Sequence, residues 1–144
     1  MSRRRLEDLP RVESGEVLFR LVGSHAYDFD GSAGVRVQNS ALTKSEMTPT
    51  STSYGPSVFV ESLLPDGMAS LEEACPAWRQ KGYAAIPIED LRAIGIDVRL
   101  SKEDCEFDSV RAAHGSLIGV TRTNRPSVVH LISQYLVRPP ERKS

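Results

Sequence analysis

Glu16-Val-Leu-Phe-Arg-Leu-Val22 is an apolar run with the length of a β-strand. Successive side chains of a strand point to opposite faces, so Val17, Phe19 and Leu21 share one face. Arg20 then lies on the other face, where it is either exposed to solvent or directed at an anion or carboxylate. We expect the exposed arrangement, because arginine is rarely buried. The run therefore predicts a sheet strand with a charge on its second face.

Five further segments have the composition or alternation of short strands, and they are 35–40, 57–61, 83–88, 96–100 and 110–118. Pro87 places the third of these toward a sheet edge, because proline has no N–H to donate to a ladder. A short helix is predicted at Ser70, whose hydroxyl forms a capping box with Glu73. Pro76 ends or kinks that helix, since proline lacks the donor that a helix interior needs.

The final helix is predicted over 125–137, where apolar residues form a continuous stripe and Asn124 is a candidate cap. Residues 89–94 form one or two helical turns that Gly95 closes. Strands and helices that do not alternate strictly favour an α+β fold over a doubly wound sheet. We therefore expect a small, mostly antiparallel sheet of about five or six short strands with two or three helices, the last of them packed on the sheet.

The length of 144 residues is that of a single domain, spanning 1–144, which can bury roughly two thirds of its unfolded surface. The segments 1–14 and 138–144 are expected to fray. Residues 43–56 are rich in Ser, Thr and Pro, which predicts a long mobile loop. Such loops are uncommon in small domains and are often functional where they occur.

The composition argues against several classes of protein. A net charge of -1 and a pI near 6.3 do not suit wholesale electrostatic binding to nucleic acid or anionic membranes. No apolar run reaches the length of a membrane span, and no such run follows the basic N-terminus to form a signal peptide. Cys75 and Cys105 lie 30 residues apart without a metal-binding spacing, so we expect two free thiols. We expect a soluble, cytoplasmic protein of bacterial origin and leave its oligomeric state open.

Charge is distributed unevenly along the chain. Residues 61–108 carry five basic and eleven acidic side chains, whereas residues 109–144 carry six basic and one acidic side chain. Such asymmetry can form a basic surface for a partner, or it can bring two oppositely charged parts together inside one fold. Nucleic-acid binding through 109–144 is the weaker expectation, because Tyr135 is the only Phe, Trp or Tyr there to stack on a base.

The loop Tyr27-Asp-Phe-Asp-Gly-Ser-Ala-Gly34 gathers more potential ligands than any other segment, with His25 shortly before it. The pentad that starts at Asp28 (DFDGS) resembles the first motif of the haloacid-dehalogenase-like phosphatases. This resemblance implies that Asp28 is the nucleophile, that Asp30 is the general acid/base, and that both help to hold magnesium. The lysine and the paired acids that follow later in that family have no clear equivalents in this chain. Lys102-Glu-Asp104 is the only segment that places a lysine and two acids close together as a candidate for them.

The same acids also resemble the start of an EF-hand calcium loop, in which they take the first and third ligand positions. Ala33 stands where that loop needs glycine, and Asn39 stands where it needs a bidentate glutamate. A divalent metal held by His25, Asp28 and Asp30 is therefore one hypothesis. We favour a turn between two strands, because Asp and Gly are the residues that tight turns use. No cofactor is expected.

Two other places carry candidate functional side chains. His114 lies in a predicted strand between small residues, which leaves room for a ligand or suits a general base. A hydrogen-bonded core or edge histidine is the more common role. Arg122 and Arg125 flank the entry to the final helix, where hydroxyls and a helix N-terminus can hold a phosphate or carboxylate. An ordinary capped connection is the alternative there.

The sequence supports two functional hypotheses. The first is a non-catalytic interaction or regulatory domain that acts with a protein partner, since no complete catalytic set is present. The second is a small enzyme or ligand-binding domain for a phosphate-bearing or nucleotide-like substrate, and it requires at least three candidate side chains to share one cleft. Those candidates are Arg20, His25, Asp28, Asp30 and His114. The sequence favours the first hypothesis and leaves open whether the protein is an enzyme.

Overall fold

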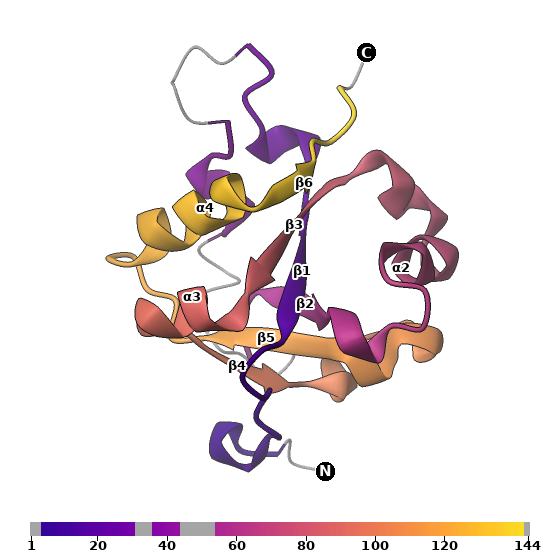
Figure 1. Cartoon of the computed structure of the whole chain (residues 1–144), viewed down its shortest axis with the longest axis vertical. Coiled ribbons are helices and arrows are strands. Elements are labelled where there is room, and N and C mark those ends of the chain that lie inside the picture. Colours follow the sequence, from indigo (N-terminus) through magenta and orange to yellow (C-terminus); the bar gives the residue numbers. More distant parts are fainter. Residues whose placement is uncertain (1–3, 31–35, 44–53, 143–144) are drawn as a thin grey trace.

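The centre of the molecule is a sheet of six antiparallel strands, seen in a computed structural model that describes residues 4–30, 36–43 and 54–142. The strands are β1 (Val17–Val22), β2 (Ser57–Val60), β3 (Gly82–Pro87), β4 (Asp97–Leu100), β5 (His114–Ile118) and β6 (Leu136–Arg138). They lie in the order β4-β5-β2-β1-β3-β6, and every neighbouring pair is antiparallel (Figure 1). The expected small α+β fold with an antiparallel sheet is confirmed.

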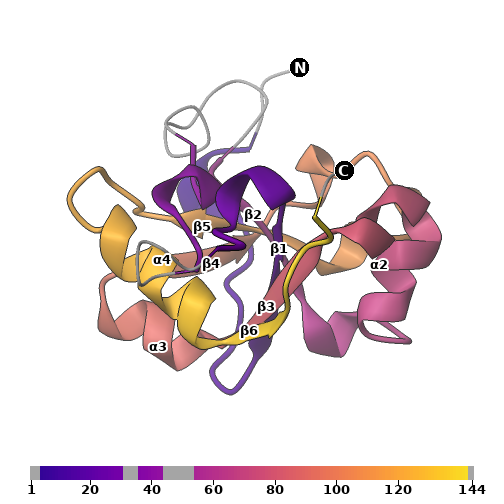
Figure 2. The same cartoon turned by 90° about the horizontal axis from the view of Figure 1, so that it is seen from above.

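Helices cover both faces of this sheet. The α-helices are α2 (Met68–Ala74), α3 (Ile88–Ala93) and α4 (Arg125–Gln134). Two views show α3 and α4 on one face and α2 on the other (Figures 1 and 2). The connections contain short 3-10 helices, which are η1 (Leu6–Asp8), η2 (Ser24–Ala26), η3 (Asn39–Ala41), η4 (Glu61–Leu63), η5 (Pro76–Gln80), η6 (Lys102–Asp104) and η7 (Asp108–Ala113).

Each face of the sheet has its own apolar core, because side chains alternate along the central strands. Leu18 and Val22 of β1 belong to the larger core, which also contains Leu91 of α3 and Ile132 of α4. Phe19 points to the opposite face and joins the smaller core. The smaller core is formed with residues of α2, β2 and η7, among them Phe59, Met68, Leu71 and Val110. Burial on both faces explains why β1 reads as a nearly continuous apolar run.

The strand expected at 35–40 is not formed by its described residues. Val37 makes an isolated bridge to Tyr27, and η3 begins at Asn39. Val37 is nevertheless only 1% exposed. The alternation there reflects the burial of one side chain, which a single bridge is enough to hold in place.

Two elements have limits that differ from those expected. The start of the strand predicted at 110–118 is η7, so β5 begins only at His114. Val110 and Ala113 are both buried, and a spacing of three places them on one side of a 3-10 helix. The final helix ends at Gln134, because the residues that follow pair with β3 as β6.

The partner strand β6 also changes the place of β3 in the sheet. β3 lies between β1 and β6, so its expected position toward an edge is wrong. Pro87 is tolerated because it is the last residue of β3, where its register partner is Val17, the first residue of β1. A proline at a strand end interrupts no further pairing.

The helix α2 begins before the predicted capping box. Gly67, with a φ of 58°, precedes the helix, and Ser70 lies inside it. The Ser70 hydroxyl accepts a hydrogen bond from the N–H of Asp66 at 2.9 Å, so it does not cap at the predicted place. The helix ends at Ala74, shortly before Pro76, as the proline predicts.

Some expected segments lie partly outside the described residues. The loop predicted at 43–56 falls mostly on 44–53, which are among those not described. The C-terminal segment 138–144 begins within β6, at Arg138. Within the described ranges, no helix is long and apolar enough to span a membrane.

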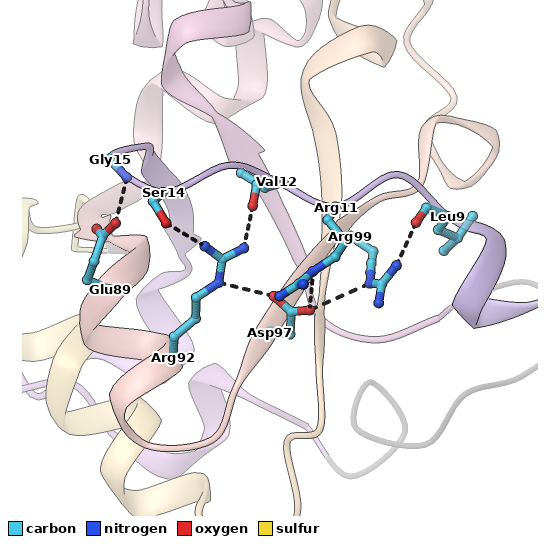
Figure 3. A network of polar contacts seen from close by, with 9 residues as sticks. All are labelled: Leu9, Arg11, Val12, Ser14, Gly15, Glu89, Arg92, Asp97 and Arg99. Atoms are coloured by element: carbon cyan, nitrogen blue, oxygen red, sulfur yellow. Dashed lines mark hydrogen bonds and ion pairs between the residues drawn. The ribbon is translucent and has the colours of Figure 1, made fainter.

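The N-terminal segment, expected to fray over 1–14, is packed in its described part, since Leu9 and Val12 are 1% and 4% exposed. A network around Asp97 fastens this segment to β4 and α3 (Figure 3). The Nε atoms of Arg92, Arg11 and Arg99 lie 3.3, 3.5 and 3.6 Å from the aspartate carboxylate. Two of these arginines also donate to backbone carbonyl oxygens of the N-terminal segment. One carboxylate therefore organises three guanidinium groups.

Replacing Asp97 with asparagine is expected to lower the free energy of unfolding by about 2 kcal/mol, because the arginines lose a charged acceptor. Burial alone would raise the pKa of Asp97. The hydrogen bonds from the Val98 N–H and Arg92, together with the charge of Arg11, outweigh burial, so the pKa of Asp97 lies below its ordinary value. A carboxyl with a lowered folded-state pKa stabilises the fold above its unfolded pKa, near 3.8. This contribution is lost as the pH falls through the folded-state pKa.

Urea unfolding at about pH 7 and about pH 2.5 measures this effect, and the difference between wild type and Asp97→Asn should shrink at the lower pH. Asp66→Asn removes an exposed carboxylate elsewhere and serves as the control. A difference that stays constant between the two pH values contradicts the role of the Asp97 charge.

Candidate functional site

A cavity of about 420 Å³ lies on the side of the sheet that carries the smaller core. Its volume is typical of sites for small molecules. One wall is aromatic, since Trp78 packs between Phe59 and Phe107 with ring centroids 5.8 and 5.1 Å from its own. Polar side chains line the rest of the cavity and include Arg20, His25, Ser57, Lys81, Asp104, Glu106 and His114. The cavity thus combines an aromatic wall with groups that can bond to a polar ligand.

His114 is the centre of a chain of hydrogen bonds at the base of this cavity. Its Nε2 lies 3.1 Å from Oγ of Ser57, and its Nδ1 lies 2.9 Å from the carbonyl oxygen of Ser101. The Oγ of Ser101 lies 3.2 Å from the same Nδ1 and 2.7 Å from Oγ of Ser116. Three of the four residues are buried, and only Ser57 is exposed. A ligand in the cavity therefore meets the chain at the Ser57 hydroxyl.

Three neighbouring strands place these four residues together. Ser57 of β2 is the register partner of Ser116 in β5, and Phe59 is the partner of His114. Side chains of such pairs lie on the same face within contact distance. Ser101 directly follows β4, and its N–H donates to the carbonyl oxygen of His114 at 3.0 Å. The chain of hydrogen bonds is thus a product of sheet register.

The proton positions on His114 follow from its neighbours. A carbonyl oxygen only accepts, so the Ser101 carbonyl requires the proton on Nδ1. Nε2 is then unprotonated and accepts from the Ser57 hydroxyl. Burial lowers the pKa of His114, and the opposing effects of the Ser101 carbonyl and the Asp104 charge do not reverse this. A neutral imidazole with an unprotonated Nε2 can act as a general base.

Arg20 lies beside Ser57 and is only 7% exposed, so the expectation that it faces solvent is wrong. The strands β1 and β2 pair only at Leu18 and Phe19. Beyond that point the Arg20 guanidinium takes the place of backbone hydrogen bonds between the two strands. Its Nη1 donates to the carbonyl oxygen of Ser57 at 2.8 Å, and its Nη2 donates to the carbonyl oxygen of Ala41 at 2.6 Å. The arginine is directed at backbone oxygens where two strands separate.

Basic and ionisable side chains lie where the cavity adjoins a second hollow. His25 and Lys81 line the cavity and also line the second hollow of about 550 Å³. Arg142 of the C-terminal segment lines the second hollow as well. Gly23 leaves space for His25, because a Cβ at Gly23 would lie 2.7 Å from the His25 Nδ1. The two hollows share His25 and Lys81, which together with Arg142 form what we call the basic rim, and the acid Glu141 also lines the second hollow.

The structure brings Arg20, His25 and His114 to one cavity, but Asp28 and Asp30 are not among its described lining residues. Oδ1 of Asp28 accepts from the N–H of Asp30 at 3.1 Å, which is an Asx turn. The Asp30 carboxylate forms an ion pair with Arg142, whose Nη2 lies 3.3 Å from Oδ1 of Asp30. In the described part of the chain, no three His, Cys, Asp or Glu side chains are grouped so that they could hold a metal ion.

Arg122 and Arg125 are not among the described lining residues of either hollow. The residues around them bond to each other: the N–H of Thr121 donates to Oδ1 of Asn124 at 2.7 Å, and the N–H of Asn124 donates to Oγ1 of Thr121 at 3.2 Å. Arg125 donates to the carbonyl oxygen of Leu42 at 3.4 Å. The entry to α4 is thus an internally bonded connection.

Three lining residues, Ser57, Trp78 and Lys81, carry no recognised functional pattern in the sequence. Trp78 is the only tryptophan in the chain, which is the one signal that could have drawn attention to it. Ser57 is 57 residues from His114 in the sequence. Its role becomes visible only once β2 and β5 are paired.

The chemistry of the cavity has to be judged on its own geometry. Comparisons of the chain with models of known protein families, with curated proteins and with solved structures gave no match.

Proposed function

We propose that the protein binds a small molecule with a planar ring and an anionic group, such as a nucleotide, in the cavity beside Trp78. The observation that carries this proposal is the combination of an aromatic wall with a basic rim. Aromatic side chains stack on planar rings. Lys81, which lines both hollows, can donate charge-assisted hydrogen bonds to a phosphate or carboxylate. Arg142 adds positive charge in the second hollow, where it also pairs with Asp30 at 3.3 Å.

The acids of the lining suit the same class of ligand. Asp104 and Glu106 can accept hydrogen bonds from the hydroxyls of a ribose or from an exocyclic amine. One oxygen of Asp104 accepts from the N–H of Tyr54 at 3.1 Å, which helps to position the carboxylate. A nucleotide offers a ring, hydrogen-bond donors and an anion, so it matches all three kinds of lining group.

The fluorescence of Trp78 reports directly on the cavity, because the chain has no other tryptophan. At least one of the four ribonucleoside monophosphates is expected to change this fluorescence and to raise the melting temperature. The matching nucleoside, without phosphate, and ribose 5-phosphate, without a ring, should need about tenfold higher concentrations or more. Lys81→Ala should weaken nucleotide binding about tenfold, because it removes a charged donor from the rim.

Lys102→Ala is the matched control, since Lys102 is exposed in η6 and is not among the described lining residues of either hollow. Its affinity should equal that of wild type. Equal responses to ribose 5-phosphate and to the nucleotides contradict a role for the aromatic wall. Equal weakening by both lysine variants contradicts a role for the rim.

A protein partner stays a prediction, as do a cytoplasmic location and a bacterial origin. Among the described residues, the large apolar side chains that are exposed are Leu63 and Val137, at 46% and 56%. They come from η4 and β6, and single exposed apolar side chains do not mark a docking surface. The charge asymmetry is partly met inside the fold, where Arg138 from the basic third pairs with Glu72 from the acidic middle at 3.0 Å. These contacts give no preference to the interaction-domain hypothesis.

A further inference from the structure

Ser57 and His114 are arranged as a nucleophile and its base. The Ser57 hydroxyl lies 3.1 Å from Nε2 of His114, while Nδ1 faces the carbonyl oxygen of Ser101 at 2.9 Å. The imidazole is also in edge contact with Phe59, with ring centroids 5.3 Å apart. A nucleophile, a base and an orienting group within hydrogen-bond reach are the arrangement that nucleophilic catalysis uses.

The exposure of the two residues suits this chemistry. Ser57 is exposed and lines the cavity, so a bound ligand can reach its hydroxyl. His114 is 3% exposed and lies behind it, shielded from bulk water. Its burial also favours the neutral imidazole at neutral pH, since it lowers the pKa of His114. The base therefore needs no prior deprotonation at that pH.

We propose that Ser57 and His114 hydrolyse carboxylic esters that carry a planar ring and an anionic group, an inference that rests on the ligand class proposed above. Nε2 of His114 takes the hydroxyl proton while Oγ of Ser57 bonds to the ester carbonyl carbon. The bond from that carbon to the alcohol oxygen breaks, and His114 returns the proton to the departing alcohol. Water then attacks the acyl-serine, gives its proton to Nε2, and the bond to Oγ breaks. The carboxylic acid is released, and the Ser57 hydroxyl recovers its proton from His114.

Esters fit this pair better than amides do. The group behind His114 is the Ser101 carbonyl, which orients the imidazole but has no full negative charge to stabilise its protonated form. A base of this kind suits an alcohol leaving group, which departs more readily than an amine. Arg20 also lines the cavity and donates from Nη1 to the Ser57 carbonyl oxygen at 2.8 Å, so it contributes positive charge to the surroundings of Ser57.

A fluorophosphonate probe tests the inference, because an activated serine oxygen displaces its fluoride and forms a stable bond to phosphorus. We expect one adduct per chain, located on Ser57 by peptide mass spectrometry. The labelling rate should fall as the pH is lowered through the pKa of His114, which lies below about 6.5. Ser57→Ala should abolish the adduct, whereas Ser109→Ala removes an exposed serine of η7 that is not among the described lining residues of either hollow, and it should leave the rate unchanged. His114→Gln should slow labelling about 100-fold or more.

Substitution of the buried His114 can also unfold the protein, so Ser57→Cys gives a second measurement at an exposed position. The comparison is Ser40→Cys, which places a thiol at another exposed lining serine. At about pH 6 the thiol at position 57 should react with iodoacetamide about tenfold faster than the thiol at position 40, because the adjacent imidazole stabilises the thiolate. Equal rates for these two variants overturn the inference.

The absence of an adduct on the wild type at about pH 8, or an unchanged adduct in Ser57→Ala, also overturns it. If nucleotides change the Trp78 fluorescence while the probe fails to label, the hydrolytic pair is wrong and the ligand class stands. If Ser57 is labelled while no nucleotide binds, the ligand class is wrong and the activated serine stands.

Discussion

Replacing Arg20 with methionine is expected to lower the free energy of unfolding by about 3–4 kcal/mol. Methionine fills much of the same space but offers no donor. The carbonyl oxygens of Ser57 and Ala41, which the guanidinium holds at 2.8 and 2.6 Å, both lose that hydrogen bond. Each buried polar group left without a partner costs about 1–3 kcal/mol. The loss should be large because β1 and β2 have no backbone pairing at this point to take its place.

Urea unfolding followed by the fluorescence of Trp78 measures this change. Arg122→Met is the control, since Arg122 is exposed and its replacement should change stability by no more than about 0.5 kcal/mol. Arg20→Lys keeps the charge, but one ammonium group cannot reproduce the fork that spans two carbonyl oxygens, so its loss should be intermediate. Equal unfolding midpoints for Arg20→Met and Arg122→Met contradict the bridging role.

Much of the fold could be predicted from local patterns. β1 is a nearly continuous apolar run because both of its faces are buried, and β4 alternates as a strand should. The end of α3 was predictable from Gly95, whose φ of 85° is a conformation that glycine adopts easily. Such elements carry their own signal, because burial or backbone geometry acts on each of their residues.

Elements decided by distant partners could not be predicted in this way. β6 has only three residues, too few to show a period, and it exists because Leu136 pairs with Ala84 of β3. The position of Arg20 depends on where β1 and β2 separate, which no pattern within either strand records. Sequence periodicity describes the burial of a residue and not the identity of its partner.

The candidate site was predictable only at its histidine. Small neighbours point to His114, and Gly115 is indeed closely approached, since a Cβ there would lie 3.0 Å from the carbonyl oxygen of Arg99. Its partner Ser57 has no such signal, because the contact depends on the register between β2 and β5. The acidic loop gave a stronger motif than either residue, yet its Asp28 carboxylate bonds to the loop's own backbone.

Replacing Gly55 with alanine is expected to destabilise the fold by about 3 kcal/mol and to disturb the Ser57–His114 pair. A Cβ at Gly55 would lie 2.2 Å from the carbonyl oxygen of Leu117, which is held in β5. The segment before β2 must then move away from β5, which weakens the hydrogen bond from the Leu117 N–H to the Pro56 carbonyl oxygen, now 2.9 Å long. Overpacking costs about 1–3 kcal/mol and a lost hydrogen bond about 1 kcal/mol.

Gly15→Ala is the matched control, because Gly15 has a φ of 86° but nothing within 4 Å of an added Cβ. It should cost about 1 kcal/mol from backbone strain alone. Gly55 has no positive φ, so a larger loss in Gly55→Ala comes from the steric clash with β5 and not from backbone strain. Displacement of this segment moves the Ser57 hydroxyl relative to Nε2 of His114, so fluorophosphonate labelling should also slow while Gly55→Ala remains folded. A Gly55→Ala variant with the stability of Gly15→Ala and wild-type labelling would mean that the segment adapts locally. The close approach of Gly55 to β5 would then have no part in positioning Ser57.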